Sequence, residues 1–288
     1  MKKWMWIPIV LLVTFLGDRA FSYVLGSLVD RADFRYSRLY TDRAEADIVL
    51  LGNSRGLNFY EPILQEQTGL RTLNLSYNAM PIDVGAALLQ DYLDRYGAPQ
   101  HLIVDITMLD RDNDDLVRDF RVYAPYSNRL DSLLRQRDAR IWGGTKVAKL
   151  SGYGGEVAQR AFYYLTKSDR DWMVDRDIST TMIAGAETLE LYKFDYTERR
   201  IQLLERVLSR YRSEGTQIAL VVNPYYPPFQ STLANLGQFK SDVTATTGLP
   251  VRDYSDFVQS DKNFGDYQHL NKNGVALYLQ QLIADLGL

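Results

Sequence analysis

The sequence predicts an α/β protein with three layers, α/β/α, around a mostly parallel five-stranded sheet. From about Asp42 onward, apolar runs rich in β-branched residues alternate with amphipathic stretches of helical period, as is typical of parallel strands joined by helical crossovers. Between residues 110 and 195 the alternation lapses into helical, tyrosine-rich and arginine-rich sequence. The chain is therefore expected to carry a mainly helical insertion.

Each element is predicted from its own pattern. The apolar runs predict strands at 47–51, 72–76, 101–107 and 217–222, and "LPVRDYS" adds a fifth at 249–255. Helices are indicated where apolar residues recur at helical spacing, with a proline near the start or a glycine at the end. These stretches cover 60–69, 84–97 and 196–215.

Composition and charge exclude several classes of function. The chain has 288 residues and a net charge of -3, with basic and acidic residues interspersed, so it gives no support for nucleic-acid binding. Cysteine is absent, which excludes disulfides, a thiol nucleophile and a thiolate metal site. The densest run of charge, "DRDNDD" at 110–115, is interpreted as a solvated loop. We expect no metal and no cofactor.

The first residues are typical of a signal sequence or signal anchor. Two lysines precede an apolar stretch from Trp4 to Leu16, which is shorter than the about 20 residues of a full membrane span. No small-residue cleavage site is visible, so we expect an uncleaved single-pass anchor over residues 1–25 in the cytoplasmic membrane. The lysines would lie inside and the body in the periplasm or cell exterior. A cleaved signal peptide and a cytosolic protein with a buried N-terminal helix are the alternatives.

The first strand ends in a Gly-Asn-Ser-Arg-Gly turn. The glycines allow a sharp bend into the next helix, which is a sufficient structural reason for this turn. The turn also places Ser54 at the carboxyl end of a parallel strand, where open α/β sheets bind ligands. A serine nucleophile needs a base, and the chain has two histidines. His101 opens a strand and so lies at its wrong end, whereas His269 follows Asp266 by three residues, close enough for the carboxylate to fix the imidazole tautomer.

The serine turn after the first strand, together with "DYQHLNKNGVALY" before the last helix, resembles the SGNH (GDSL-like) hydrolase superfamily, whose fold is flavodoxin-like. The resemblance covers residues 46–108 and 196–288. It implies a catalytic domain over 43–288, within which 110–195 is the helical insertion.

The resemblance also implies roles for individual residues. Ser54 would be the nucleophile, His269 the general base and Asp266 its orienting acid. The family's second block offers a glycine amide to the oxyanion, and the matching "NLSYNAM" has Ala79 there; the backbone amides of Ala79 and Ser54 can serve, since a backbone donor needs no particular side chain. The third block of the family brings an asparagine, for which "IVDITMLDRDND" has no clear equivalent. The Asn78 side chain is a candidate substitute.

The apolar N-terminus, the GNSR turn and the HLNxxG ending look like the membrane-tethered branch of the superfamily, which includes alginate acetylation proteins and the D-alanine transfer protein of teichoic acid synthesis. This likeness implies a serine acyltransferase or esterase acting on acyl groups, chiefly O-acetyl, of a cell-surface polysaccharide, with a membrane-bound O-acyltransferase as partner.

Two other classes are weighed against this interpretation. An inactive scaffold or glycan-binding subunit of the same fold is favoured by the missing asparagine. A nucleotide-binding module is disfavoured, because "GNSRG" matches neither GxGxxG nor a Walker loop.

Overall fold

The computed structural model describes residues 4, 6–169 and 173–288. These residues form two compact units. The first, called here the helical unit, comprises the described residues of 1–43 together with 114–169. The second, the sheet unit, comprises 44–113 and the described residues of 170–288, and it contains every strand and the candidate site.

The sheet unit is built on five parallel strands in the order β2-β1-β3-β4-β5. All five predicted strands are found, so the predicted fold class is confirmed. In the register of β1 against β3, Ile48 lies opposite His101 and Leu51 opposite Val104, which brings the carboxyl ends of these strands to one edge. The strands are β1 (Ile48–Leu51), β2 (Thr72–Asn74), β3 (His101–Asp105), β4 (Gln217–Val222) and β5 (Val251–Asp253).

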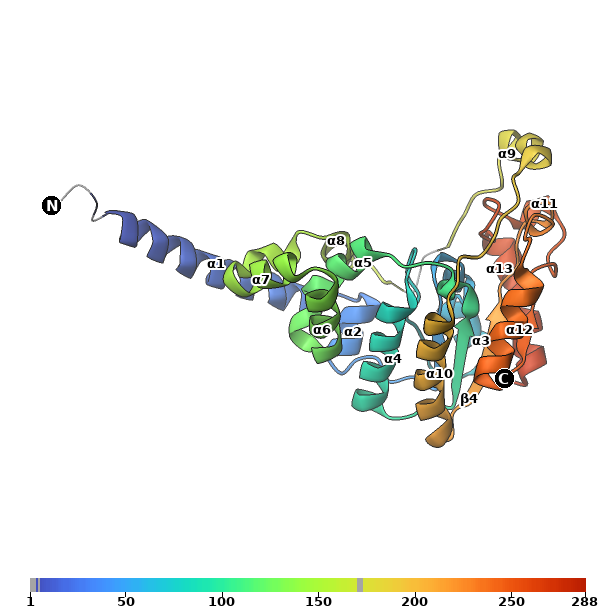
Figure 1. Ribbon diagram of the computed structural model, residues 1–288, viewed down its shortest axis with the longest axis horizontal. Helices are drawn as coiled ribbons and strands as arrows, with labels where there is room; N and C mark the ends of the chain where they lie inside the picture. Colours follow the sequence, from blue (N-terminus) through green and yellow to red (C-terminus); the bar gives the residue numbers. More distant parts are fainter. Residues whose placement is uncertain (1–3, 5, 170–172) are drawn as a thin grey trace. The chain divides into compact units, whose positions relative to one another are not determined.

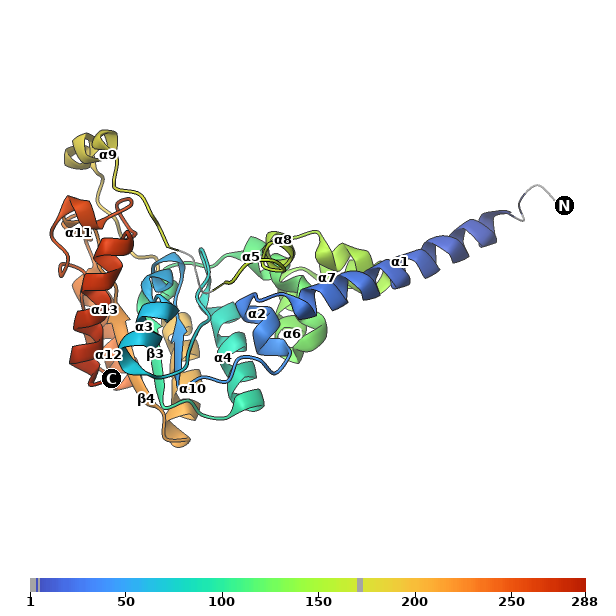
Figure 2. The same cartoon turned by 180° about the vertical axis from the view of Figure 1, so that it is seen from behind.

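Helices cover both faces of this sheet (Figures 1 and 2). One face carries α4 (Ile82–Tyr96), α10 (Glu198–Ser213) and α12 (Leu236–Thr247), and the other carries α3 (Glu61–Thr68) and α13 (Lys272–Leu286). The short helices α9 (Thr180–Gly185) and α11 (Pro227–Gln230) complete the unit. The helices predicted at 60–69, 84–97 and 196–215 correspond to α3, α4 and α10.

Because β1 and β3 lie inside the sheet, both of their faces are covered, and this is why they read as continuous apolar runs. All four side chains of β1, Ile48 to Leu51, are fully buried. Burying one Ile or Leu side chain contributes about 1.5–3 kcal/mol. The strands thus form a rigid support, and the loops that follow β1 and β3 carry the candidate site.

The helical unit consists of α1 (Trp6–Arg31), α2 (Arg35–Tyr40), α5 (Asp114–Asp119), α6 (Asn128–Arg137), α7 (Ala139–Val147) and α8 (Glu156–Tyr163). Its core is aromatic, with Phe34, Tyr36 and Tyr123 fully buried against one another. The Arg35 guanidinium and the Asp169 carboxylate form a buried pair, with Nε 2.7 Å from Oδ2.

These contacts group residues 114–169 with the N-terminal segment. The compact units therefore have other bounds than the predicted insertion at 110–195, whose remaining described residues belong to the sheet unit.

Helix α1 is long and apolar enough to cross a membrane. An 18-residue stretch of it has a mean hydropathy of 1.6, and 6% of that stretch is buried. Apolar side chains such as Leu11 and Val13 are more than half exposed. The structure therefore does not show the buried N-terminal helix that was one alternative. The side of the membrane on which the rest of the chain lies stays a prediction.

Candidate active site

Two glycines make the turn after β1 compact. A Cβ on Gly52 would come within 2.8 Å of Gly56 Cα, and a Cβ on Gly56 would come within 2.4 Å of Ser76 Oγ. Asn53 Oδ1 accepts a hydrogen bond from the Arg55 amide at 3.0 Å, and a short 3₁₀ helix begins at Ser54. The turn therefore presents Ser54 at the carboxyl edge of the sheet.

The structure brings His269 and Asp266 together. Nδ1 of His269 lies 2.8 Å from Oδ1 and 2.9 Å from Oδ2 of the carboxylate. Oδ1 also accepts the amides of Gln268 at 2.9 Å and His269 at 3.0 Å, which folds the loop around it. With Nδ1 assigned as the donor, Nε2 is left as an acceptor. Nε2 is buried and has no hydrogen-bond partner among the described residues.

The Asp266 carboxyl is stabilised as the anion. Burial raises its pKa, but the hydrogen bond and charge of the His269 ring and the amides of Gln268 and His269 outweigh burial, so the pKa lies below the ordinary 3.8. The Arg176 guanidinium, with Nη2 3.7 Å from Oδ2, adds positive charge. Asp266 therefore stays ionised at neutral pH and can stabilise an imidazolium beside it.

The residues after His269 fasten its loop to α13. Asn271 Oδ1 accepts the amide of Gly274 at 3.2 Å, and Asn271 Nδ2 donates to the carbonyl of Lys262 at 2.8 Å. Gly274 leaves no room for a side chain, because a Cβ would lie 2.1 Å from the Asn263 carbonyl oxygen. The "HLNKNG" sequence thus has a local structural reason, which is to fix the His269 loop at the start of α13.

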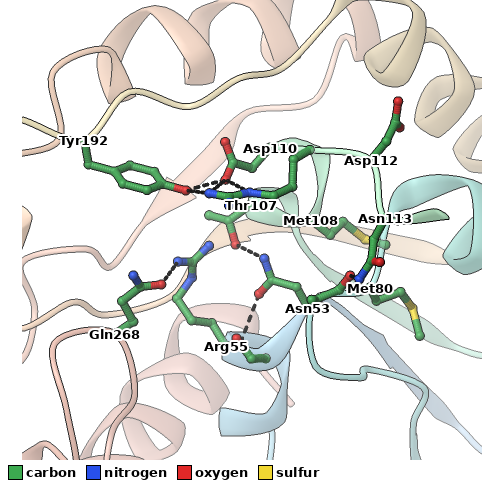
Figure 3. Close-up of a pocket in the computed structure, with 13 residues that line it drawn as sticks. Asn53, Arg55, Met80, Thr107, Met108, Asp110, Asp112, Asn113, Tyr192 and Gln268 are labelled. Carbon is green, nitrogen blue, oxygen red and sulfur yellow. Dashed lines mark hydrogen bonds and ion pairs between the residues drawn. The ribbon is translucent and has the colours of Figure 1, made fainter. Parts of the chain in front are cut away.

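A hydrogen bond joins the Ser54 turn to the His269 loop. Arg55 Nη1 donates to Gln268 Oε1 at 3.4 Å (Figure 3), so the residue after Ser54 contacts the residue before His269. The hydrogen bonds of the described residues include none between Ser54 and His269 themselves. The structure therefore places the two loops side by side, with Ser54 and His269 not hydrogen-bonded to each other.

A cavity of about 260 Å³ lies at the carboxyl ends of β1 and β3. In a sheet of this strand order the chain changes direction between these strands, and ligands bind there. Ser54, Ala79 and Gln268 line this cavity. Asn53 Nδ2 reaches across it from the β1 side to Thr107 Oγ1 at 3.4 Å (Figure 3). His101, at the amino end of β3, lines a different cavity.

Two backbone amides face no competing acceptor. Those of Ser54 and Ala79 donate to no other atom of the described residues. Ala79 has a φ of 52°, a left-handed conformation that a side chain disfavours. Asn113 Nδ2 donates a hydrogen bond to the Ala79 carbonyl at 3.0 Å.

Asn78 is exposed and does not line the cavity. The side-chain amides of Asn53, Asn113 and Gln268 do line it. The sequence gives no signal for Asn53, because its place in the Gly-Asn-Ser-Arg-Gly turn is a sufficient reason for it.

A buried ion pair lies next to the Ser54 turn. Arg55 Nε is 3.8 Å from Asp105 Oδ2, and the two side chains are 5% and 0% exposed. The Arg55 guanidinium carbon also lies 4.4 Å from the centroid of the Tyr225 ring. The amide of Thr107 donates to Asp105 Oδ1 at 2.9 Å. Burial raises the pKa of Asp105, despite the positive charge of Arg55 and the Thr107 donors.

Sequence reasoning missed this pair. The one available signal was a carboxylate at the end of an otherwise apolar strand, since "HLIVD" closes β3 with Asp105.

Polar side chains line the cavity on the side of the loop after β3 (Figure 3). Tyr192 accepts a hydrogen bond from Arg111 Nη2 at 2.6 Å and donates one to Asp110. Burial and the Asp110 contact raise the pKa of Tyr192. Arg200 of α10 donates to the Asp110 carbonyl at 3.0 Å. Hydroxyl, guanidinium, carboxylate and amide groups in one place suit a ligand with several hydroxyls.

No group of three or more His, Asp and Glu side chains placed to hold a metal ion occurs among the described residues.

Comparison with known proteins finds no matching family model and no matching curated protein. Among solved structures, one from Bacteroides fragilis, described as a candidate acylhydrolase, is similar over 83% of this chain and 86% of that chain, with a TM-score of 0.39 and 11% identity. The functional assignment rests on the site itself.

Proposed function

We propose that this chain is a serine-dependent acyltransferase or esterase of the SGNH type, with Ser54 as nucleophile, His269 as base and Asp266 as its orienting acid. The observation that carries the proposal is the state of the His269 ring. Nδ1 is held by a carboxylate, while Nε2 is buried without a partner, in a loop bonded to the residue after Ser54. Hydrogen bonds between catalytic groups are often loose in free enzymes and tighten when substrate binds.

The arrangement supports acyl transfer in two steps. As Ser54 Oγ bonds to the acyl carbon, Nε2 of His269 takes its proton, and the carbonyl oxygen becomes an oxyanion facing the amides of Ser54 and Ala79. Collapse breaks the bond to the leaving oxygen, which takes the proton from Nε2. A sugar hydroxyl or water then gives a proton to Nε2 and attacks the acyl carbon. As this second intermediate collapses, the bond to Ser54 Oγ breaks and Oγ takes the proton back from Nε2.

We infer that the acyl group is carried by a cell-surface polysaccharide, most simply as an O-acetyl ester. The polar lining formed by Asp110, Arg111 and Tyr192 supports an acceptor with several hydroxyls. The exposed apolar α1 supports a membrane tether. We propose further that the sheet unit lies on the extracytoplasmic side and that a membrane-bound O-acyltransferase is its partner.

A fluorophosphonate probe tests the catalytic proposal. We expect it to label the wild-type protein at a serine, because an activated serine attacks the probe's phosphorus. Labelling should disappear in Ser54→Ala and persist in Ser241→Ala, a matched change of a serine on α12. A folded wild-type protein that stays unlabelled, or a Ser54→Ala protein that is labelled equally, would overturn the assignment.

Two observations favour a second candidate, a glycan-binding or scaffold subunit with the same fold. Ser54 and His269 share no hydrogen bond in this structure, and Asn78 lies outside the cavity. If the protein is a scaffold, the wild type and Ser54→Ala should bind oligosaccharide equally well, and neither should hydrolyse an acyl ester. Turnover of p-nitrophenyl acetate that Ser54→Ala abolishes decides for the enzyme.

A further inference from the structure

Charge is divided unequally between the two units. The segments of the helical unit, residues 1–43 and 114–169, contain 17 Lys and Arg against 11 Asp and Glu, whereas those of the sheet unit contain 16 against 25. The protein's net charge of -3 therefore conceals an excess of positive charge on the unit that contains the candidate membrane helix. Positive charge beside a membrane helix is attracted to anionic lipid headgroups.

An exposed part of the helical unit is the α7 segment, defined here as residues 139–153, which comprises α7 and the 3₁₀ helix after it. No residue of α7 is buried. Val147 is 76% exposed and Leu150 37%. The segment contains three basic residues and no acidic one, and Arg140 and Lys149 form no ion pair with any described residue. α7 packs against α6, and Lys146 forms an ion pair with Asp131 at 2.6 Å. The basic and apolar side chains that α7 leaves exposed are typical of a helix at a membrane surface.

Hydrogen bonds attach the α7 segment to α1 at Asp18 and Arg19. Asp18 accepts the amides of Lys149 and Leu150, each at 2.9 Å, and Arg19 Nη2 donates to the Val147 carbonyl at 3.2 Å. The uninterrupted apolar stretch before Asp18, from Trp4 to Leu16, is about 20 Å long as a helix. Because that is shorter than the roughly 30 Å hydrocarbon core of a bilayer, the charges of Asp18 and Arg19 cannot lie far outside the membrane.

We propose that the α7 segment is a second membrane contact, which binds the surface of a bilayer containing anionic phospholipid. Arg140 and Lys149 would meet the headgroup phosphates, and Val147 and Leu150 would enter the interface beside α1. The proposal rests on α1 crossing the bilayer. It explains why an otherwise folded unit leaves a helix without buried residues next to its anchor.

The absence of cysteine allows a direct test with single nitroxide labels on the full chain. The chain is reconstituted into phosphatidylcholine bilayers with or without phosphatidylglycerol. We expect a label at Val147→Cys to be accessible to oxygen and shielded from a polar nickel chelate when phosphatidylglycerol is present. A label at Leu277→Cys, an exposed apolar position on α13, should stay accessible to the chelate. A label at Leu12→Cys reports whether α1 itself is inserted.

Charge removal supplies the matched control. Arg140→Gln with Lys149→Gln should lower the ratio of shielded to water-exposed label at position 147 by about fivefold for each residue. Arg206→Gln with Lys262→Gln, an equal change on the exposed surface of the sheet unit, should leave that ratio unchanged.

Three outcomes would overturn the proposal. The label at 147 could be as open to the chelate as that at 277 while position 12 is inserted. It could be shielded equally without phosphatidylglycerol, or shielded in proportion to protein concentration, as a contact with a second copy would be. If position 12 is also open to the chelate, the anchor itself fails, whereas Ser54 labelling by the fluorophosphonate probe is independent of all these results.

Discussion

At the scale of single residues, the surroundings of the His269 ring support the proposed function. Its Nε2 is a buried acceptor without a partner, and leaving such an atom unsatisfied typically costs about 1–3 kcal/mol. The ring is nevertheless held in place, because Asp266 binds Nδ1. A costly arrangement that the surrounding structure enforces is characteristic of functional sites, and a serine hydroxyl is the partner that the proposed function supplies.

The first prediction concerns how much Ser54, His269 and Asp266 each contribute to kcat. Ser54→Ala and His269→Ala should each abolish nearly all of the triad's contribution to kcat, and the double variant should lose little more, because the two groups act as a unit. Asp266→Asn keeps the shape but can hold the wrong tautomer, which in another serine triad costs about ten-thousandfold. Steady-state hydrolysis of p-nitrophenyl acetate measures all four. Losses that multiply in the double variant would show that the residues act independently.

A second residue-scale prediction concerns Ala79, whose φ of 52° is one that glycine adopts at no steric cost. Ala79→Gly should raise the free energy of unfolding by up to about 1 kcal/mol and leave activity nearly unchanged, since the amide remains. Ala79→Pro removes the amide and should lower kcat about a hundred to a thousandfold. Urea unfolding and esterase turnover give both quantities.

The matched control for Ala79 is Ala86→Gly within α4. There the same change should lower the free energy of unfolding by about 1 kcal/mol. Equal destabilisation at both positions would refute the left-handed conformation of Ala79.

Among the elements, the start of α13 determines where the base stands. Gly274→Ala would put a Cβ 2.1 Å from the Asn263 carbonyl oxygen, so the His269 loop must shift. We expect a loss of about 1–3 kcal/mol of stability together with a large fall in kcat. Gly237→Ala in α12, where nothing lies within 4 Å of the new Cβ, should stabilise by up to about 1 kcal/mol. A Gly274→Ala protein with normal turnover would show that the loop does not need this close approach.

The strands and long helices could be predicted because period and apolar content are local properties of the sequence. The apolar run "DIVLL" predicts a buried strand without reference to the rest of the chain. The glycines that follow it predict the serine turn in the same local way. The Arg55–Asp105 pair could not be predicted, because it depends on the ends of β1 and β3 meeting in space. The position of Asn78 outside the cavity likewise depends on the turn that Ala79 makes, and no spacing rule encodes that turn.

For the whole molecule, the proposed function requires one arrangement of the chain across the membrane. We expect the full-length protein in the membrane fraction. In intact spheroplasts, a membrane-impermeant maleimide should modify Leu277→Cys, whereas Lys2→Cys should react only after lysis. The chain has no cysteine of its own, so each reaction is read without background. The reverse pattern would place the sheet unit in the cytoplasm and exclude a cell-surface substrate.

The hydrogen bond from Arg55 to Gln268, between the two loops of the site, also has a consequence in time. It joins residues 213 positions apart, so Ser54 is synthesised well before His269. At about 5–20 residues per second, a ribosome adds the histidine roughly ten to forty seconds after the serine. A chain not yet extended to His269, or one that a protease has cut before this residue, would carry Ser54 without its proposed base. We therefore expect activity only in copies that contain both loops.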